Sequence, residues 1–220
     1  MITRTMTIKA VIFDMDGVLI DSIKYVLKSF NEVLKKDGVH ITKDEMSKFN
    51  GRPLEDMLAW LKRDHNITYS PEEFEEKALA LQLKLMREEF KDNKKLINLI
   101  ETLKAKDLKL AVATSSLRGR AEKILGLLEV KDYFDVILTA EDVTNHKPNP
   151  EVFLKAAKKL GVNPEECVVI EDAANGIQAA KKGGMKAIAL LTEFQTKKEL
   201  KDADFIIDSL DELNEKLDEL

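Results

Sequence analysis

The stretch Ala-Val-Ile-Phe-Asp-Met-Asp-Gly-Val at residues 10–18 decides how the rest of this chain folds. It opens with an unbroken apolar run, which predicts a strand buried on both faces, as in parallel sheets. Asp14 and Asp16 follow directly, and residues two apart in an extended chain project to the same side. Ligands bind at the carboxyl ends of the strands in open parallel sheets. We therefore expect both carboxylates to converge on one site at that edge of a sheet.

Three interpretations of this stretch compete. Asp14 and Asp16 can be a nucleophile and its acid/base partner, or they can form an ordinary turn, since aspartate and glycine favour turns. A calcium loop would need further oxygen ligands and a closing glutamate at fixed spacing, which the apolar residues 18–20 do not supply. From this stretch alone, the catalytic site and the turn are about equally supported.

The composition narrows the class of protein. The chain has 220 residues and a formal net charge of −5, without a basic block, so we expect no nucleic-acid partner. No apolar run reaches membrane-spanning length, and residues 1–9 lack the apolar core of a signal peptide, so we expect no membrane partner. The single cysteine, Cys167, cannot form a disulfide within the chain and fits a reducing, cytoplasmic location.

Apolar periodicity divides the chain into two parts. Residues 21–92 show only helical spacing, with helices expected at 22–36, 43–49, from Pro53 onward and at 71–90. After residue 94, helices alternate with buried strands, which are expected at 108–113, 134–138, 167–170, 187–191 and 205–207. We predict an α/β fold, a doubly wound parallel sheet formed by residues 1–17 and 93–220, with residues 18–92 inserted as an all-helical cap domain.

Polar side chains follow three more of the expected strands. Thr114 and Ser115 end the second, Lys147 lies in the loop after the third, and Glu171 and Asp172 end the fourth. Each group has an ordinary alternative, as a helix cap, a solvated surface charge or an acidic helix start. Because the carboxyl ends of parallel strands meet at one edge, we expect these groups to lie together with the aspartates of the first strand.

Such a set suits phosphoryl transfer. Asp14 can attack phosphorus and form an aspartyl-phosphate, while Asp16 serves as acid for the leaving oxygen and then as base for water. Thr114 and Lys147 can hold the phosphoryl oxygens. Crowded carboxylates repel one another and oxygen ligands favour Mg²⁺. We therefore expect a Mg²⁺ cofactor and a small phosphorylated metabolite as substrate.

Over its whole length the chain resembles the haloacid dehalogenase superfamily of phosphohydrolases. Four motifs carry the resemblance: Asp-Met-Asp-Gly-Val at 14–18, Val-Ala-Thr-Ser-Ser at 112–116, Lys-Pro-Asn-Pro-Glu at 147–151, and Val-Ile-Glu-Asp-Ala-Ala-Asn-Gly-Ile at 169–177. The helical insertion is similar to the cap of the subgroup that contains β-phosphoglucomutase, phosphoglycolate phosphatase and sugar phosphatases. The resemblance implies a Rossmann-like core and a cap that closes over the site.

The resemblance also implies roles for individual residues. Asp14 is implied as the nucleophile and Asp16 as the acid/base, with Thr114, its neighbour Ser115, and Lys147 binding the phosphoryl group. The metal ligands that it implies are the carboxylates of Asp14 and Asp172 and the backbone carbonyl of Asp16, with Glu171 close by.

Two positions differ from the mutases of this subgroup. Val26 stands where they have a histidine, and Leu54 stands where they have a cap arginine that grips a distal phosphate. These differences favour a phosphatase for a sugar phosphate or phosphoglycolate over a β-phosphoglucomutase-like phosphomutase. Arg52 lies close to that position, and we expect it to contact the substrate.

An alternative from another class is a phosphoryl-accepting signalling module. Such modules place an aspartate, a hydroxyl and a lysine on a similar sheet, but they are shorter and have no helical cap. A non-catalytic binding module has no need for both Asp14 and Asp16.

Overall fold

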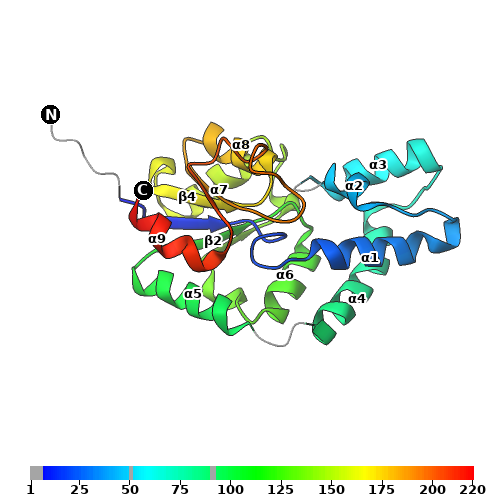
Figure 1. Cartoon of the computed structure of the whole chain (residues 1–220), viewed down its shortest axis with the longest axis horizontal. Coiled ribbons are helices and arrows are strands. Elements are labelled where there is room, and N and C mark those ends of the chain that lie inside the picture. Colours follow the sequence, from blue (N-terminus) through cyan, green and yellow to red (C-terminus); the bar gives the residue numbers. More distant parts are fainter. Residues whose placement is uncertain (1–6, 50–51, 90–92) are drawn as a thin grey trace.

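The computed structural model describes residues 7–49, 52–89 and 93–220. It contains a six-stranded sheet in the order β3-β2-β1-β4-β5-β6, with every neighbouring pair parallel. Its strands are β1 (Ala10–Phe13), β2 (Lys109–Ala113), β3 (Val136–Leu138), β4 (Cys167–Glu171), β5 (Lys186–Leu190) and β6 (Phe205–Ile207). Figure 1 shows this sheet beside a helical lobe. The predicted doubly wound α/β fold is confirmed.

Strand β1 occupies the centre of the sheet because its apolar residues can be buried on both faces. Ile12 pairs with Ala111 of β2 and with Val169 of β4, and all three side chains are fully buried. The strand order reverses at β1, with β2 and β3 on one side and β4 to β6 on the other. This reversal opens a crevice at the carboxyl ends, where ligands of such sheets bind.

Helices cover both faces of the sheet (Figure 1). Val11 and Phe13 belong to an apolar cluster with one group of helices, and Ala10 and Ile12 belong to a cluster with the other. The first group is α5 (Lys94–Ala105), α6 (Arg118–Leu127) and α9 (Leu213–Asp218), and the second is α7 (Glu151–Leu160) and α8 (Ala174–Lys182). The period-two alternation of β1 therefore supplies two separate hydrophobic layers.

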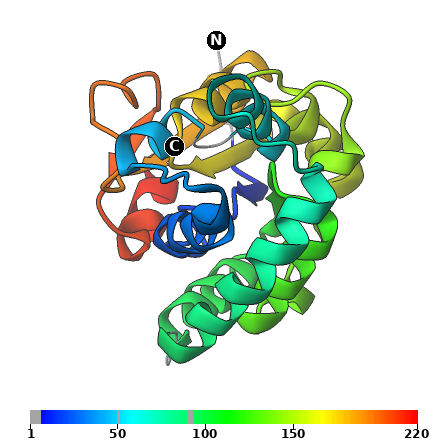
Figure 2. The ribbon, with the colours of Figure 1, turned by 90° about the vertical axis from the view of Figure 1, so that its right-hand side faces the viewer.

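The helical lobe has an apolar core of its own. It consists of α1 (Ile23–Leu34), α2 (Lys43–Ser47), α3 (Leu54–His65) and α4 (Pro71–Glu89). Phe30 and Phe74 meet edge to face at its centre, with ring centroids 4.8 Å apart. The Oγ of Ser70 accepts a hydrogen bond from the N–H of Glu73 at the start of α4. We call this lobe the cap; α4 also packs against α6 of the sheet domain (Figure 2).

Several ends of elements differ from the sequence-based expectation. Strand β3 begins two residues late, because Lys131–Tyr133 forms a 3₁₀ turn and Phe134 follows it. The first helix tightens into a 3₁₀ turn at Lys35–Asp37, which Gly38 ends with a φ of 70°. The turn expected at Asn50–Gly51, the helix end near Phe90 and the boundary at 92/93 lie outside the described residues. None of the helices in the described ranges combines the length and apolar character that a membrane span requires.

Candidate active site

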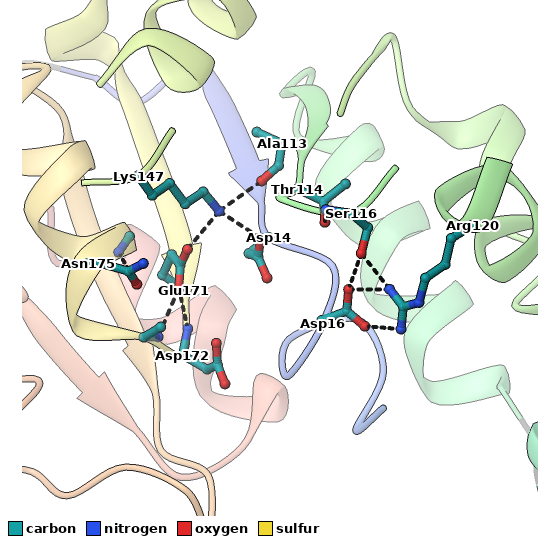
Figure 3. Close-up of polar contacts among 12 residues, drawn as sticks. Asp14, Asp16, Ala113, Thr114, Ser116, Arg120, Lys147, Glu171, Asp172 and Asn175 are labelled. Atoms are coloured by element: carbon teal, nitrogen blue, oxygen red, sulfur yellow. Dashed lines mark hydrogen bonds and ion pairs between the residues drawn. The ribbon is translucent and has the colours of Figure 1, made fainter. Parts of the chain in front are cut away.

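Five of the predicted residues meet at the carboxyl edge of the sheet (Figure 3). Asp14 directly follows β1, and its N–H donates to the carbonyl of Ile170. Thr114 follows β2, Lys147 precedes α7, and Glu171 ends β4 with Asp172 next in the chain. All five residues are buried. The parallel topology therefore brings together groups from four distant segments, as expected.

Lys147 is the centre of a buried charge cluster. Its Nζ donates to Oδ1 of Asp14 at 2.7 Å, to Oε1 of Glu171 at 2.8 Å and to the carbonyl of Ala113 at 3.1 Å. Its side chain is 1% exposed, so the alternative of a solvated surface charge is wrong. Burial by itself would lower the pKa of Lys147, but the two carboxylates outweigh it and raise that pKa. Lys147 therefore stays protonated and positively charged.

Asp14, Glu171 and Asp172 form an acidic cluster beside that ammonium group. Each offers one carboxylate oxygen, and these oxygens lie within 4.8 Å of one another. Burial raises the pKa of Asp14 to about 7, against the lowering effect of Lys147. Three buried carboxylates face one ammonium group, so in the ionised state the cluster has an excess of negative charge that favours a bound cation.

The backbone around this cluster requires two glycines. A β-carbon on Gly17, which has a φ of +85°, would lie 2.1 Å from Oδ2 of Asp172. A β-carbon on Gly176 would lie 1.8 Å from Oε1 of Glu171. Both glycines therefore let the backbone approach a carboxylate more closely than any other residue could. The result is a compact set of oxygen donors, which is the donor type that Mg²⁺ prefers.

Asp14 and Asp16 line the same pocket, as expected, but the side chain of Asp16 lies outside the acidic cluster. Arg120 holds it instead: Nη1 donates to Oδ2 at 2.5 Å and Nη2 donates to Oδ1 at 2.6 Å. The hydroxyls of Ser22 and Ser116 also donate to it. Figure 3 shows this carboxylate turned toward Arg120. Asp16 lies directly before a tight turn, in which the N–H of Gly17 donates to the carbonyl of Ile20.

The same ion pair sets the protonation of Asp16. Burial acts to raise its pKa, but the charge and hydrogen bonds of Arg120 outweigh burial, and the pKa is lowered. Asp16 is therefore a carboxylate at neutral pH in this arrangement. Only its backbone carbonyl was implied as a metal ligand, and its side chain is outside the acidic cluster.

The hydroxyl residues after β2 face the pocket and do not serve as the helix cap. Helix α6 has Leu117 as its N-cap, so the alternative of a Ser/Thr cap is wrong. The Oγ1 of Thr114 accepts from the N–H of Ser116, which leaves its O–H as a donor. Thr114 and Ser115 both line the pocket next to Asp14. This position suits donation to an anionic oxygen.

The pocket lies between the sheet domain and the cap. Its cap side includes Val26, Leu54 and Arg52, together with the apolar side chains of Phe30 and Phe49. Arg52 forms an ion pair with Asp56 at 2.7 Å. The two positions that we expect to differ from the mutases, Val26 and Leu54, therefore both line the pocket, and Arg52 lines it as well.

Arg120 and Glu75 were not singled out from the sequence. Both line the pocket, and Arg120 is 7% exposed. A signal existed for each: Arg120 lies on the apolar stripe that continues at Ile124, and Glu75 lies on the stripe that continues at Leu79. A charged residue on a buried stripe indicates a paired or functional side chain.

Comparisons with known proteins agree with this geometry. The family model of haloacid dehalogenase-like hydrolases matches residues 11–190. A phosphorylated carbohydrates phosphatase of Thermotoga maritima is 35% identical over 180 residues, 82% of this chain and 83% of that protein. Hexitol phosphatase B of Escherichia coli is 33% identical over 213 residues, 95% of this chain and 96% of that protein.

A solved structure resembles the whole chain. The crystal structure of β-phosphoglucomutase from Clostridium difficile superposes with a TM-score of 0.81 at 28% identity, covering 97% of this chain and 98% of that one. The similarity thus includes both the sheet domain and the cap. The chain belongs to the family of haloacid dehalogenase-like hydrolases.

Proposed function

We propose that this protein is a Mg²⁺-dependent phosphatase that hydrolyses a small phosphomonoester through an aspartyl-phosphate on Asp14. The observation that carries the proposal is the buried cluster of Asp14, Lys147 and Glu171. It adjoins a pocket that Asp14 and Thr114 line. Relatives named as phosphatases of phosphorylated carbohydrates and hexitols support a sugar or polyol phosphate as substrate.

In the first step, a carboxylate oxygen of Asp14 bonds to phosphorus and the bond to the leaving alcohol breaks. Asp16 gives its proton to the leaving oxygen. Thr114 donates a hydrogen bond to a phosphoryl oxygen, and Lys147 donates another by exchanging one of its three present hydrogen bonds, as charge builds on these oxygens in the transition state. In the second step, Asp16 takes a proton from water, water attacks phosphorus, and Asp14 leaves with inorganic phosphate as the other product.

The two steps need Asp16 in two protonation states. Its ion pair with Arg120 keeps it deprotonated, which suits the base of the second step. The first step needs a proton on Asp16 and a position near the leaving oxygen. Asp16 must therefore turn away from Arg120 when substrate binds.

The donors present fit Mg²⁺. The carboxylates of Asp14 and Asp172, supported by Glu171, would hold the ion together with the backbone carbonyl of Asp16. Bound there, Mg²⁺ supplies positive charge that lowers the repulsion between the nucleophile and the phosphate. Lys147 orients Asp14 from the other side and prevents its free rotation.

A phosphomutase would need to hold a second phosphate. Leu54 and Val26 face the pocket in place of the residues that serve mutases, and neither side chain can hydrogen-bond an anion. This favours hydrolysis over phosphate transfer within a sugar. We propose that Arg52, at the pocket edge, contacts the substrate after leaving Asp56.

Phosphate release from a panel of phosphomonoesters, with Mg²⁺ and with excess chelator, tests the proposal. We expect release only with Mg²⁺, and the Asp172→Asn variant should need a higher Mg²⁺ concentration for half its maximal rate. Isomerisation of a sugar phosphate without net release would instead establish the mutase. Release that is insensitive to the chelator would contradict the proposed metal site.

A further inference from the structure

The cap contributes a carboxylate to the pocket, and one of its oxygens has no hydrogen-bond partner among the described residues. Glu75 lies on α4 and lines the pocket, and its Oε1 is buried without a hydrogen bond to any described residue. Buried polar atoms are nearly always hydrogen-bonded, so an exception calls for an explanation. Because Glu75 lines the active-site pocket, a rotation of its side chain would present this oxygen to a substrate.

The charged groups around Glu75 do not supply the hydrogen bond that its Oε1 lacks. Arg120 is the cation that acts on it most strongly, but the guanidinium of Arg120 donates to Asp16, to Oγ of Ser116 and to Oε1 of Gln82. Burial, together with the charges of Asp16, Glu141 and Glu55, raises the pKa of Glu75 to about 7 against the lowering effect of Arg120. At neutral pH its carboxyl group can therefore either accept or donate a hydrogen bond.

In this structure the positive charges of the pocket are already paired with carboxylates. Its two cationic side chains in the described ranges are Arg52 and Arg120, and each is paired with an aspartate. Glu55 and Glu75 add negative charge to the same wall. A second phosphate or a carboxylate on the substrate would be repelled by these acids and would have to compete with an aspartate for its arginine, which is unfavourable in a partly buried site.

Much of the cap wall is apolar. Phe30, Phe49, Leu54 and Met57 contribute to it, and such a surface packs against the C–H faces of a carbohydrate while a few polar groups fix its orientation. Glu75 is then a polar group of the cap wall placed to bind hydroxyls.

We propose that Glu75 is a specificity-determining residue that hydrogen-bonds a hydroxyl group of the leaving alcohol. The substrates are then monophosphates of neutral polyhydroxy compounds, such as hexoses or hexitols, and substrates with a second phosphate or a carboxylate are disfavoured. This inference rests on the proposed phosphatase activity and adds the chemical class of its leaving group.

The test measures kcat/KM for a hexitol monophosphate, a hexose bisphosphate, phosphoglycolate and p-nitrophenyl phosphate. The last has no hydroxyl on its leaving group and reports the phosphoryl chemistry alone. For Glu75→Ala we expect kcat/KM to fall about tenfold to a hundredfold on the hexitol monophosphate and to stay unchanged on p-nitrophenyl phosphate. Glu76→Ala is the matched control, because Glu76 is the next residue of α4 and is exposed.

Glu75→Gln separates hydrogen bonding from charge. The amide can still form a hydrogen bond with a hydroxyl, so the hexitol monophosphate should remain a substrate. The kcat/KM for the bisphosphate and for phosphoglycolate should rise, because the negative charge of Glu75 is gone. An equal loss on all substrates in Glu75→Ala would reveal a structural role and overturn the inference. Unchanged kinetics on the hexitol monophosphate would overturn it as well, with the phosphatase proposal intact. If the unmodified enzyme released no phosphate from any substrate, both the inference about Glu75 and the phosphatase proposal would be overturned.

Discussion

At the scale of single residues, two ion pairs each hold one of the two aspartates that follow β1. Lys147 fixes the proposed nucleophile Asp14, and Arg120 fixes Asp16. The side chain of Lys147 is 1% exposed and that of Asp16 is 24% exposed. The nucleophile is therefore held rigidly, while the proposed acid/base keeps access to the pocket.

Removing Arg120 should destabilise the protein, because Asp16 would stay mostly buried without its cation. We expect Arg120→Ala to lower the free energy of unfolding in urea by an amount near the lower end of about 3–5 kcal/mol. Arg118→Ala is the control: its ion pair with Asp142 is more exposed and should be worth at most about 1 kcal/mol. Equal losses in the two variants would show that the Asp16–Arg120 pair has no special role.

The sequence predicted some of these residues and missed others for a physical reason. Asp14, Thr114 and Lys147 follow strands at the carboxyl edge, so topology alone brings them together. Arg120 reaches the site from within a helix, and its direction depends on how α6 packs against the sheet and α4. The orientation of Asp16 depends on Arg120 and could not be predicted without it.

At the scale of elements, the loop that carries Lys147 depends on the first residue of α7. The carboxylate of Glu151 accepts hydrogen bonds from Nζ of Lys155 and from the N–H groups of Thr144 and Asn145. These bonds lower the pKa of Glu151 from 4.5 to about 2. The folded protein thus favours the charged form, which closes the loop from residue 144 to residue 151.

A pH dependence of stability follows from this shift. Because the pKa of Glu151 is depressed in the folded state, its contribution is complete above the unfolded value of 4.5 and is lost as the pH falls to about 2. Glu151→Gln should therefore be less stable than the unmodified protein at neutral pH, and the difference should vanish near pH 2. Denaturant unfolding at several pH values measures this difference in the free energy of unfolding. Glu88→Gln, at an exposed site of α4, should show no such trend; a difference for Glu151→Gln that does not depend on pH would contradict the account.

The kinds of elements were predictable, but several of their ends were not. Apolar runs and helical stripes identify the strands and helices because burial decides them. Strand β6 has the expected bounds, since polar residues flank it on both sides. Short 3₁₀ turns such as Leu210–Glu212 depend on local hydrogen bonds to side chains. Here the side chain of Ser209 accepts from the N–H of Asp211, and apolar periodicity does not predict such bonds.

At the scale of the whole molecule, the chain has separate cores in the sheet domain and in the cap. The division into residues 18–92 and the remainder stays a prediction, and the cores offer a test of it. Phe74 is fully buried in the cap core, so Phe74→Ala should cost about 3–5 kcal/mol there. If the cap unfolds as its own unit, hydrogen exchange should speed up in α1, α3 and α4 and stay unchanged in β1.

Phe153→Ala is the counterpart on the sheet side. Phe153 is fully buried against the sheet on α7, and its loss should speed exchange in the strands. If Phe74→Ala instead exposed β1 and the cap helices equally, the molecule would be one cooperative unit and the division would be wrong.

The central claim is that phosphate passes through Asp14, and acid-quenched mass spectrometry tests it most directly. The unmodified protein and Asp16→Asn are mixed with p-nitrophenyl phosphate and Mg²⁺, quenched and digested, after circular dichroism has shown that the variants are folded. A good leaving group needs no acid, but the second step needs the base, so Asp16→Asn should accumulate one phosphoryl group on the peptide that contains Asp14. Adding Asp14→Asn should abolish both this label and phosphate release. A label on any other residue, or full activity in Asp14→Asn, would contradict the account.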